Sequence, residues 1–209
     1  MIAISTAYKE ALIAIKHDDK ENYKALDSNC KHAENILYNL DEMLDEINFD
    51  IKDNDVFSVV VGPGSFTGIR IGIALIKGFY SAHKTKLIGL TTFDLLAYCY
   101  VKYNKPKNDF YCVINALSGL YYVCKFDQEG KKISQEIVIN QEEYDKLECD
   151  KVGLEEEAIG DINVRPHPQD LLELSEIFKD KGEFIEESKL IPLYLRKSQA
   201  EASLENKKY

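Results

Sequence analysis

Apolar residues along the chain follow two spacings, one typical of strands and one typical of helices. Short apolar runs between turn residues predict strands at residues 2–6, 11–16, 22–26, 59–61, 87–90, 110–114, 120–126, 132–139, 152 and 162–164. Apolar positions that return every three or four residues predict helices over residues 33–47, 68–82, 93–103, 141–147 and 169–178. Residues 192–196 are the last stretch that we expect to be extended.

The order of these elements occurs twice. Three strands followed by alternating helices and strands appear before the polar, proline-bearing stretch 105–108, and the same outline begins again after it. We therefore predict an N-terminal lobe, residues 1–105, and a smaller C-terminal lobe, residues 106–209. The outline is typical of the α/β class with an actin-like (ASKHA, ribonuclease-H-like) two-lobe fold, in which mixed sheets are flanked by helices.

A glycine-rich elbow joins the strand at 59–61 to the following helix, and the other elements are arranged around it. Its residues are Gly62, Pro63, Gly64, Ser65 and Thr67. Two interpretations compete. Free N–H groups at the start of a helix attract phosphate, whereas a tight turn needs small residues for steric reasons alone. The spacing matches neither a P-loop nor the dinucleotide-binding fingerprint.

The helix after the elbow carries more apolar surface than one sheet can cover. Gly68 and Gly72 stand four apart and therefore lie on one face, where another helix could approach closely. That helix could belong to a partner, or it could be the chain's own helix at 33–47. The residues alone leave both alternatives open.

Charge and hydropathy restrict the classes of function. A net charge of −10 provides no basic field for nucleic acid, so contact with RNA would be indirect. No apolar run reaches membrane-spanning length. Residues 1–4 enter a strand directly, which leaves no room for a signal peptide, and we expect a cytoplasmic protein.

Candidate catalytic and metal-binding groups are sparse. The five cysteines form no CxxC pair, and His17, His32, His83 and His167 lack metal-ligand spacing. Ser65 lacks the GxSxG context of a hydrolase, with no general base near it in sequence. The acidic run 155–157 is interpreted as a solvated face. Actin-like ATPases need carboxylates on two turns to hold Mg²⁺, but Ser5 and Asn115 occupy these turns, so we expect no self-sufficient ATP hydrolysis.

Residues 62–72, GPGSFTGIRIG, closely resemble the signature of the TsaB (YeaZ) family, the bacterial accessory subunit for making threonylcarbamoyladenosine in transfer RNA. Further similarity lies in Ala3-Ile4-Ser5-Thr6, in His32-Ala33-Glu34, in residues 89–97, and in the Pro-x-Tyr-Leu-Arg pattern at 192–196. Ser5 and Asn115 depart from the aspartates usual in the family, which weakens nucleotide binding by this chain.

The resemblance implies a non-catalytic scaffold that pairs with the catalytic paralogue TsaD and is joined by the ATPase TsaE. It implies that this chain alone binds no cofactor and that ATP or ADP could bind only at the interface of the assembled complex. It also allows the isolated chain to form a homodimer. The family pairs through its first two helices, so the expected partner interface is Gly68, Ile69, Gly72, Ile73, Ile76, Leu37, Leu40 and Leu44. The alternative function is an independent actin-like ATPase or small-molecule kinase that uses the elbow for phosphate.

Overall fold

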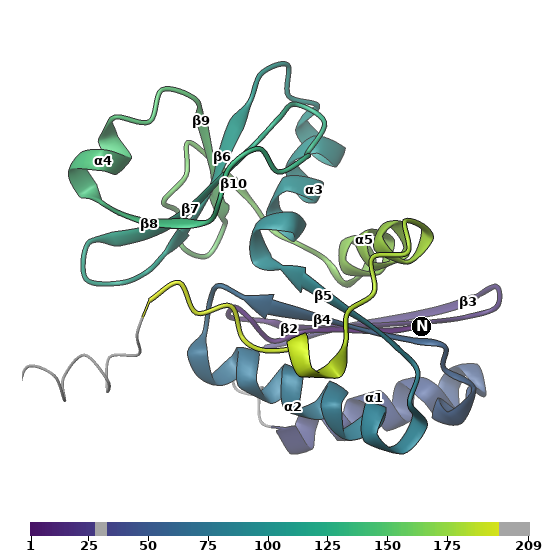
Figure 1. Cartoon of the computed structure of the whole chain (residues 1–209). Helices are drawn as coiled ribbons and strands as arrows, with labels where there is room; N and C mark the ends of the chain where they lie inside the picture. Colours follow the sequence, from purple (N-terminus) through teal and green to yellow (C-terminus); the bar gives the residue numbers. More distant parts are fainter. Residues whose placement is uncertain (28–32, 197–209) are drawn as a thin grey trace, which may run out of the picture.

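The computed structural model describes residues 1–27 and 33–196, which form two sheets with helices around them (Figure 1). The first sheet has the strand order β3-β2-β1-β4-β5, and the second has the order β10-β9-β6-β7-β8. The strands of the first sheet are β1 (Ile2–Ser5), β2 (Ala11–His17), β3 (Lys20–Leu26), β4 (Val56–Gly62) and β5 (Lys86–Thr91). Those of the second are β6 (Phe110–Asn115), β7 (Leu120–Phe126), β8 (Ile137–Asn140), β9 (Asp150–Leu154) and β10 (Ile162–Val164).

Both sheets are built on the same plan. In each, the first three strands form an antiparallel meander, a fourth strand pairs in parallel with the first, and a fifth pairs in parallel with the fourth. Parallel neighbours need crossover connections, which contain helices in every case except that of β9 and β10, where residues 155–161 form the connection. The doubled outline predicted from the sequence is therefore confirmed, as is the actin-like fold class with mixed sheets flanked by helices.

Helices cover both faces of the first sheet (Figure 1). On one face lie α1 (Ala33–Ile47) and α2 (Phe66–His83), side by side. Toward the second sheet lie α3 (Thr92–Asn104) and α5 (Pro168–Asp180), while the short α4 (Gln141–Asp145) packs beside β7 and β8. Two 3₁₀ turns complete the elements, η2 (Ile51–Asp53) and η3 (Glu187–Lys189).

The second half of the sequence also contributes to the first sheet. Helix α5 packs on β1 and β2, and the Ser175 hydroxyl lies 2.8 Å from the Ser58 hydroxyl of β4. Farther along, the Ile185 N–H donates to the Leu87 carbonyl at 2.9 Å. The division at residues 105–106 stays a prediction, and packing around the first sheet does not follow it.

The predicted helix stripe at 33–47 is confirmed for five positions that are buried against the sheet: Ile36, Leu40, Met43, Leu44 and Ile47. Leu37, expected on the same stripe, is instead 42% exposed. The expected helix caps Ser28 and Asn29, together with Cys30 and His32, lie outside the described residues.

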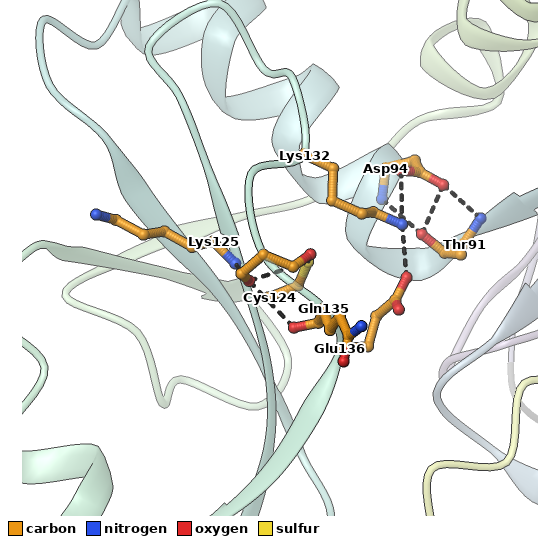
Figure 2. A network of polar contacts seen from close by, with 8 residues as sticks. Thr91, Asp94, Cys124, Lys125, Lys132, Gln135 and Glu136 are labelled. Carbon is orange, nitrogen blue, oxygen red and sulfur yellow. Dashed lines mark hydrogen bonds and ion pairs between the residues drawn. The ribbon is translucent and has the colours of Figure 1, made fainter.

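The strand predicted at 132–139 begins only at Ile137, because side-chain hydrogen bonds replace part of the backbone pairing in the segment before it (Figure 2). The Lys125 N–H of β7 donates to the Ser134 hydroxyl at 2.8 Å instead of to a backbone carbonyl. Lys132 pairs with Glu136 at 2.6 Å and with Asp94 at 3.5 Å. Because Asp94 also caps α3, this polar network anchors the segment to the first turn of that helix.

Candidate functional site

The elbow between β4 and α2 is folded directly onto the β1–β2 turn. Gly62 and Gly64 have φ values of +113° and +154°, which residues with side chains rarely adopt. A Cβ on Gly64 would lie 2.2 Å from the Ala7 carbonyl oxygen, and the Ser65 N–H donates to that oxygen at 2.6 Å. Ser65 Oγ accepts from the Gly68 N–H at 3.2 Å and so caps the start of α2. Two N–H groups that an anion would need are thus used internally, which favours the steric interpretation.

Gly68 and Gly72 face the end of β1. The Thr6 hydroxyl donates to the Gly68 carbonyl at 2.6 Å. A Cβ on Gly68 would lie 2.0 Å from the Thr6 carbonyl oxygen, and one on Gly72 would lie 2.5 Å from Thr6 Oγ1. The close neighbour is therefore a strand of the same chain, and neither a partner nor helix α1 makes this approach.

Seven of the eight residues expected to contact a partner are buried within the chain itself, and their role at an interface stays a prediction: Gly68, Ile69, Gly72, Ile73, Ile76, Leu40 and Leu44. They belong to the faces of α1 and α2 that cover the first sheet. Leu37 is exposed. Pairing through these two helices stays a prediction.

An apolar groove runs between α1 and α2 on the side away from the sheet. We call it the outer groove; it has a volume of about 570 Å³ and is lined by Leu37, Thr67, Arg70, Ile71, Ala74, Leu75, Gly78 and Phe79. No other described element covers this side of the two helices (Figure 1). Gly78 lies on the open side, since a Cβ there would meet no atom within 4 Å. The sequence prediction that α2 needs a second apolar cover thus corresponds to this surface.

Arg70 is held rigidly at the edge of the outer groove. Its guanidinium carbon lies 3.8 Å from the centre of the Phe66 ring, which is stacked on Tyr194. The Arg70 Nε–H donates to the Tyr194 hydroxyl at 2.6 Å. No acceptor for its two Nη groups lies within residues 1–27 or 33–196, so they are available to a ligand or partner.

A second hollow, of about 810 Å³, lies between the two sheets, and we call it the interlobe cleft. The elbow, the β1–β2 and β6–β7 turns and residues 193–196 line it. Glu156 accepts from the Lys9 N–H at 2.8 Å, and Glu157 accepts from the Asn115 N–H at 2.9 Å. Burial raises the pKa of Glu157 to about 7. The interpretation of 155–157 as a solvated face is therefore wrong for Glu157.

The two positions where actin-like ATPases carry carboxylates are occupied by neutral residues, Ser5 and Asn115. Ser5 is fully buried at the end of β1. Asn115 uses its side-chain oxygen to accept from the Leu117 N–H at 2.8 Å, which stabilises the β6–β7 turn. Neutral oxygens of this kind are weaker ligands for Mg²⁺ than carboxylates.

Residues 192–196 cross the interlobe cleft as a strap. The Leu193 N–H donates to the Val61 carbonyl at 2.8 Å, next to the elbow. On the other side, Arg196 Nη1 donates to the Ala116 carbonyl at 2.9 Å and to that of Leu117 at 3.3 Å. The sequence indicated an extended segment here, but it gave no signal that the segment joins the elbow to the β6–β7 turn.

Two of the histidines make contacts that stabilise the fold, and four of the cysteines form no disulfide. His17 stacks on Phe49 with ring centres 4.1 Å apart, and the His167 N–H donates to Asp170 at 2.8 Å. Cys99, Cys112, Cys124 and Cys149 are free.

In the part of the chain that the structure describes, no three His, Cys, Asp or Glu side chains are grouped as a metal site would require. Nor does any helix of that part have the length and apolar character needed to cross a membrane.

Comparison with known proteins gives the family from the sequence and a matching fold from solved structures. The family model described as "TsaD: tRNA N6-adenosine threonylcarbamoyltransferase" matches residues 27–175. The chain is 34% identical over 94 residues to the tRNA N6-adenosine threonylcarbamoyltransferase of Kosmotoga olearia, a match that covers 37% of the chain and 28% of the relative. It is 30% identical over 125 residues to the tRNA threonylcarbamoyladenosine biosynthesis protein TsaB of Buchnera aphidicola, covering 58% of each.

These matches span less than two thirds of the length of those relatives. The TsaB protein of Haemophilus influenzae matches 94% of the chain and 93% of its own length at 20% identity. Among solved structures, YeaZ from Pseudomonas aeruginosa has a TM-score of 0.76 at 22% identity, with 93% of this chain and 98% of that chain covered. At such identity the structural likeness supports the fold.

Proposed function

Because this chain belongs to the tRNA N6-adenosine threonylcarbamoyltransferase (TsaD) family, as one of its TsaB (YeaZ) members, we propose that it is an accessory subunit in threonylcarbamoyladenosine formation. In this proposal the chain pairs with a TsaD-type protein, which performs the transfer to tRNA, and contributes no catalytic residue of its own. A TsaE-type ATPase joins the assembly, and the role is exercised in the cytoplasm.

The observation that carries the proposal is the outer groove. Helices of a globular protein normally bury one apolar stripe, yet α2 buries Ile69, Ile73 and Ile76 against the sheet and still presents Ile71 and Leu75 on its other side. An exposed apolar surface of this kind marks an interaction site. Leu37 continues it onto α1.

The groove is also shaped for close approach by another helix. Ala74 and Gly78 stand one helical turn apart; alanine has only a methyl group and glycine has no side chain, so a partner helix could pack against the α2 backbone. A glycine inside a helix costs about 1 kcal/mol relative to alanine. Within the described chain Gly78 has no contact that would offset this cost.

The interlobe cleft supports an accessory rather than a hydrolytic role. Its two metal-holding positions carry the neutral side chains of Ser5 and Asn115. Among the described residues nearby, the half-buried Glu157 carboxylate accepts from the Asn115 N–H. Its raised pKa weakens it as a cation ligand at neutral pH, because a large part of it would be protonated.

Gly78→Leu tests the proposal. It fills the groove without disturbing the core, so we expect a folded protein that no longer co-purifies with the TsaD-type protein of the same organism. In cells that rely on this variant, nucleoside mass spectrometry should show loss of threonylcarbamoyladenosine. Glu142→Leu is the matched control, since it adds an exposed leucine on α4 of the other lobe. If Gly78→Leu pairs and modifies tRNA as wild type does, the proposed pairing surface is wrong.

A further inference from the structure

The outer groove has an uneven distribution of charge on its two sides. Helix α1 carries Glu34, Asp41, Glu42, Asp45 and Glu46 and contains no lysine or arginine. Across the groove, on the α2 side, Arg70 is the single charged residue of the lining. Because ion pairs that form at the edge of an apolar contact determine which partner is accepted, this pattern carries information about the partner.

The acidic residues of α1 fall into two groups with different surroundings. Glu42 pairs with Lys24 at 3.2 Å, and Glu46 accepts from Asn22 at 2.7 Å, so both are bonded to β3 of the same sheet. The other three form the acidic rim, which consists of Glu34, Asp41 and Asp45. All three are exposed, and none has a side-chain partner within the described residues.

Helix geometry places the acidic rim along the groove. Positions 34, 41 and 45 are separated by seven and four residues, which puts them on one stripe. Leu37, the α1 residue that lines the groove, stands three residues after Glu34 and four before Asp41, so it is their neighbour on the helix surface. The rim therefore borders the apolar contact surface on its α1 side.

Arg70 provides a fixed positive group on the opposite side. The Phe66 and Tyr194 rings hold its guanidinium, and the bond from Nε to the Tyr194 hydroxyl leaves the two Nη groups to face outward. A guanidinium held in this way has little side-chain freedom left to lose when it binds a carboxylate.

We propose that this face selects its partner by charge: it accepts an apolar helical surface that presents basic side chains to Glu34, Asp41 and Asp45 and one carboxylate to Arg70. A second copy of the chain would be disfavoured. Counted over the described residues, an isologous pair through this groove would bring six rim carboxylates and two Arg70 side chains into one contact. The inference rests on the proposed function, since it describes the partner that the same groove takes.

Removal of the rim charges tests the inference. The variant carries Glu34→Gln, Asp41→Asn and Asp45→Asn; its control carries Glu129→Gln, Glu142→Gln and Glu148→Gln, three exposed carboxylates of the second lobe. Both lose three negative charges, so an effect of net charge alone would appear in both. The probe is the TsaD-type protein of the same organism, measured by surface plasmon resonance at several salt concentrations.

We expect the rim variant to associate about tenfold more slowly at low salt and to lose most of its salt dependence, while the control changes less than twofold. In Arg70→Gln, dissociation should be about tenfold faster. By analytical ultracentrifugation without partner, the rim variant should dimerise at a lower concentration than wild type or the control.

Unchanged association kinetics in the rim variant, together with unchanged self-association, would overturn the charge inference even if pairing occurs. If wild type does not bind the TsaD-type protein at all, the proposed function fails, and the self-association measurement still tests the rim on this chain alone.

Discussion

The same substitution at two glycines of α2 should have opposite effects on stability. A methyl group at Gly78 would meet no atom within 4 Å, whereas at Gly72 it would lie 2.5 Å from Thr6 Oγ1 and 3.3 Å from Val59 Cγ2. Both sites are inside one helix, so Gly→Ala brings the same gain in helix propensity at each. The difference between the two variants therefore measures packing against β1 and β4.

The propensity gain is about 0.5–1 kcal/mol. At Gly78 nothing opposes it, and for a chain of this size the melting temperature should rise by about 1–4 °C. At Gly72 the added methyl group overfills a packed site, which costs about 1–3 kcal/mol. Set against the gain, this cost leaves a net loss of up to about 2.5 kcal/mol.

Thermal and urea unfolding followed by circular dichroism would measure both variants. A double-mutant cycle with Thr6→Ala then identifies the source of the loss, because removal of the hydroxyl should make Gly72→Ala less damaging, with a coupling of about 0.5–3 kcal/mol. The reasoning is refuted if Gly72→Ala stabilises the protein, or if Gly78→Ala destabilises it.

Three further predictions concern the interlobe contacts. Burial raises the pKa of Glu157 to about 7 from its usual 4.5. The stability that the protonated carboxyl group contributes is therefore complete below about pH 4.5 and is lost as the pH rises through about 7. Glu157→Gln should melt at a higher temperature than wild type at pH 8 but not at pH 5, and parallel pH profiles of the two melting temperatures would contradict this. Asp170 is fully buried and accepts from Lys102 Nζ at 2.8 Å, so Asp170→Ala should cost about 3 kcal/mol in urea unfolding; a loss below 1 kcal/mol, the scale of an exposed ion pair, would show that the bond contributes little. Arg196→Ala removes bonds to the β6–β7 turn worth about 1 kcal/mol, so hydrogen exchange at the Leu120 N–H should accelerate about fivefold; unchanged exchange would show that the strap does not hold the turn.

The fold could be predicted from the sequence because it depends on local patterns of apolar and polar residues. The buried stripe of α1 repeats at the helical period, and the strands β1 and β2 are short apolar runs that end at turn residues. The strand whose start was misplaced most, β8, fails for a tertiary reason. There the Ser134 hydroxyl accepts the bond from Lys125 that a backbone carbonyl would otherwise receive, and no periodicity reports such an exchange.

The pairing surface could not be predicted from the sequence in the same way, since α2 is apolar around most of its circumference. Gly68, Gly72 and Gly78 look equivalent in the sequence, although two of them are pressed against Thr6 and the third is open. Glu157 is a similar case. It stands in a run of acidic residues, but the fold half-buries it and places it against the N–H of Asn115, which is distant in sequence.

The contacts across the interlobe cleft have a consequence for how the chain can act. Arg165 pairs with Glu10 at 2.6 Å, the Lys9 N–H donates to Glu156, and Arg196 reaches the β6–β7 turn. Exposed ion pairs contribute about 0.2–1 kcal/mol each and hydrogen bonds about 0.5–1.5 kcal/mol. Together they amount to a few kcal/mol, which biases the two lobes toward this arrangement by a factor of about a hundred or more.

Proteins that close around a ligand need two arrangements of comparable free energy. Here the chain's own side chains already stabilise one arrangement, while none of the residues in 1–27 and 33–196 closes the outer groove. This division of roles supports a subunit that presents a fixed surface to its partner. It also predicts that the two regions separate under mutation: Arg165→Ala should loosen the lobes and leave pairing intact, whereas Gly78→Leu should block pairing and leave the lobes unchanged. If Arg165→Ala weakened pairing as much as Gly78→Leu does, the cleft and the groove would have to be coupled.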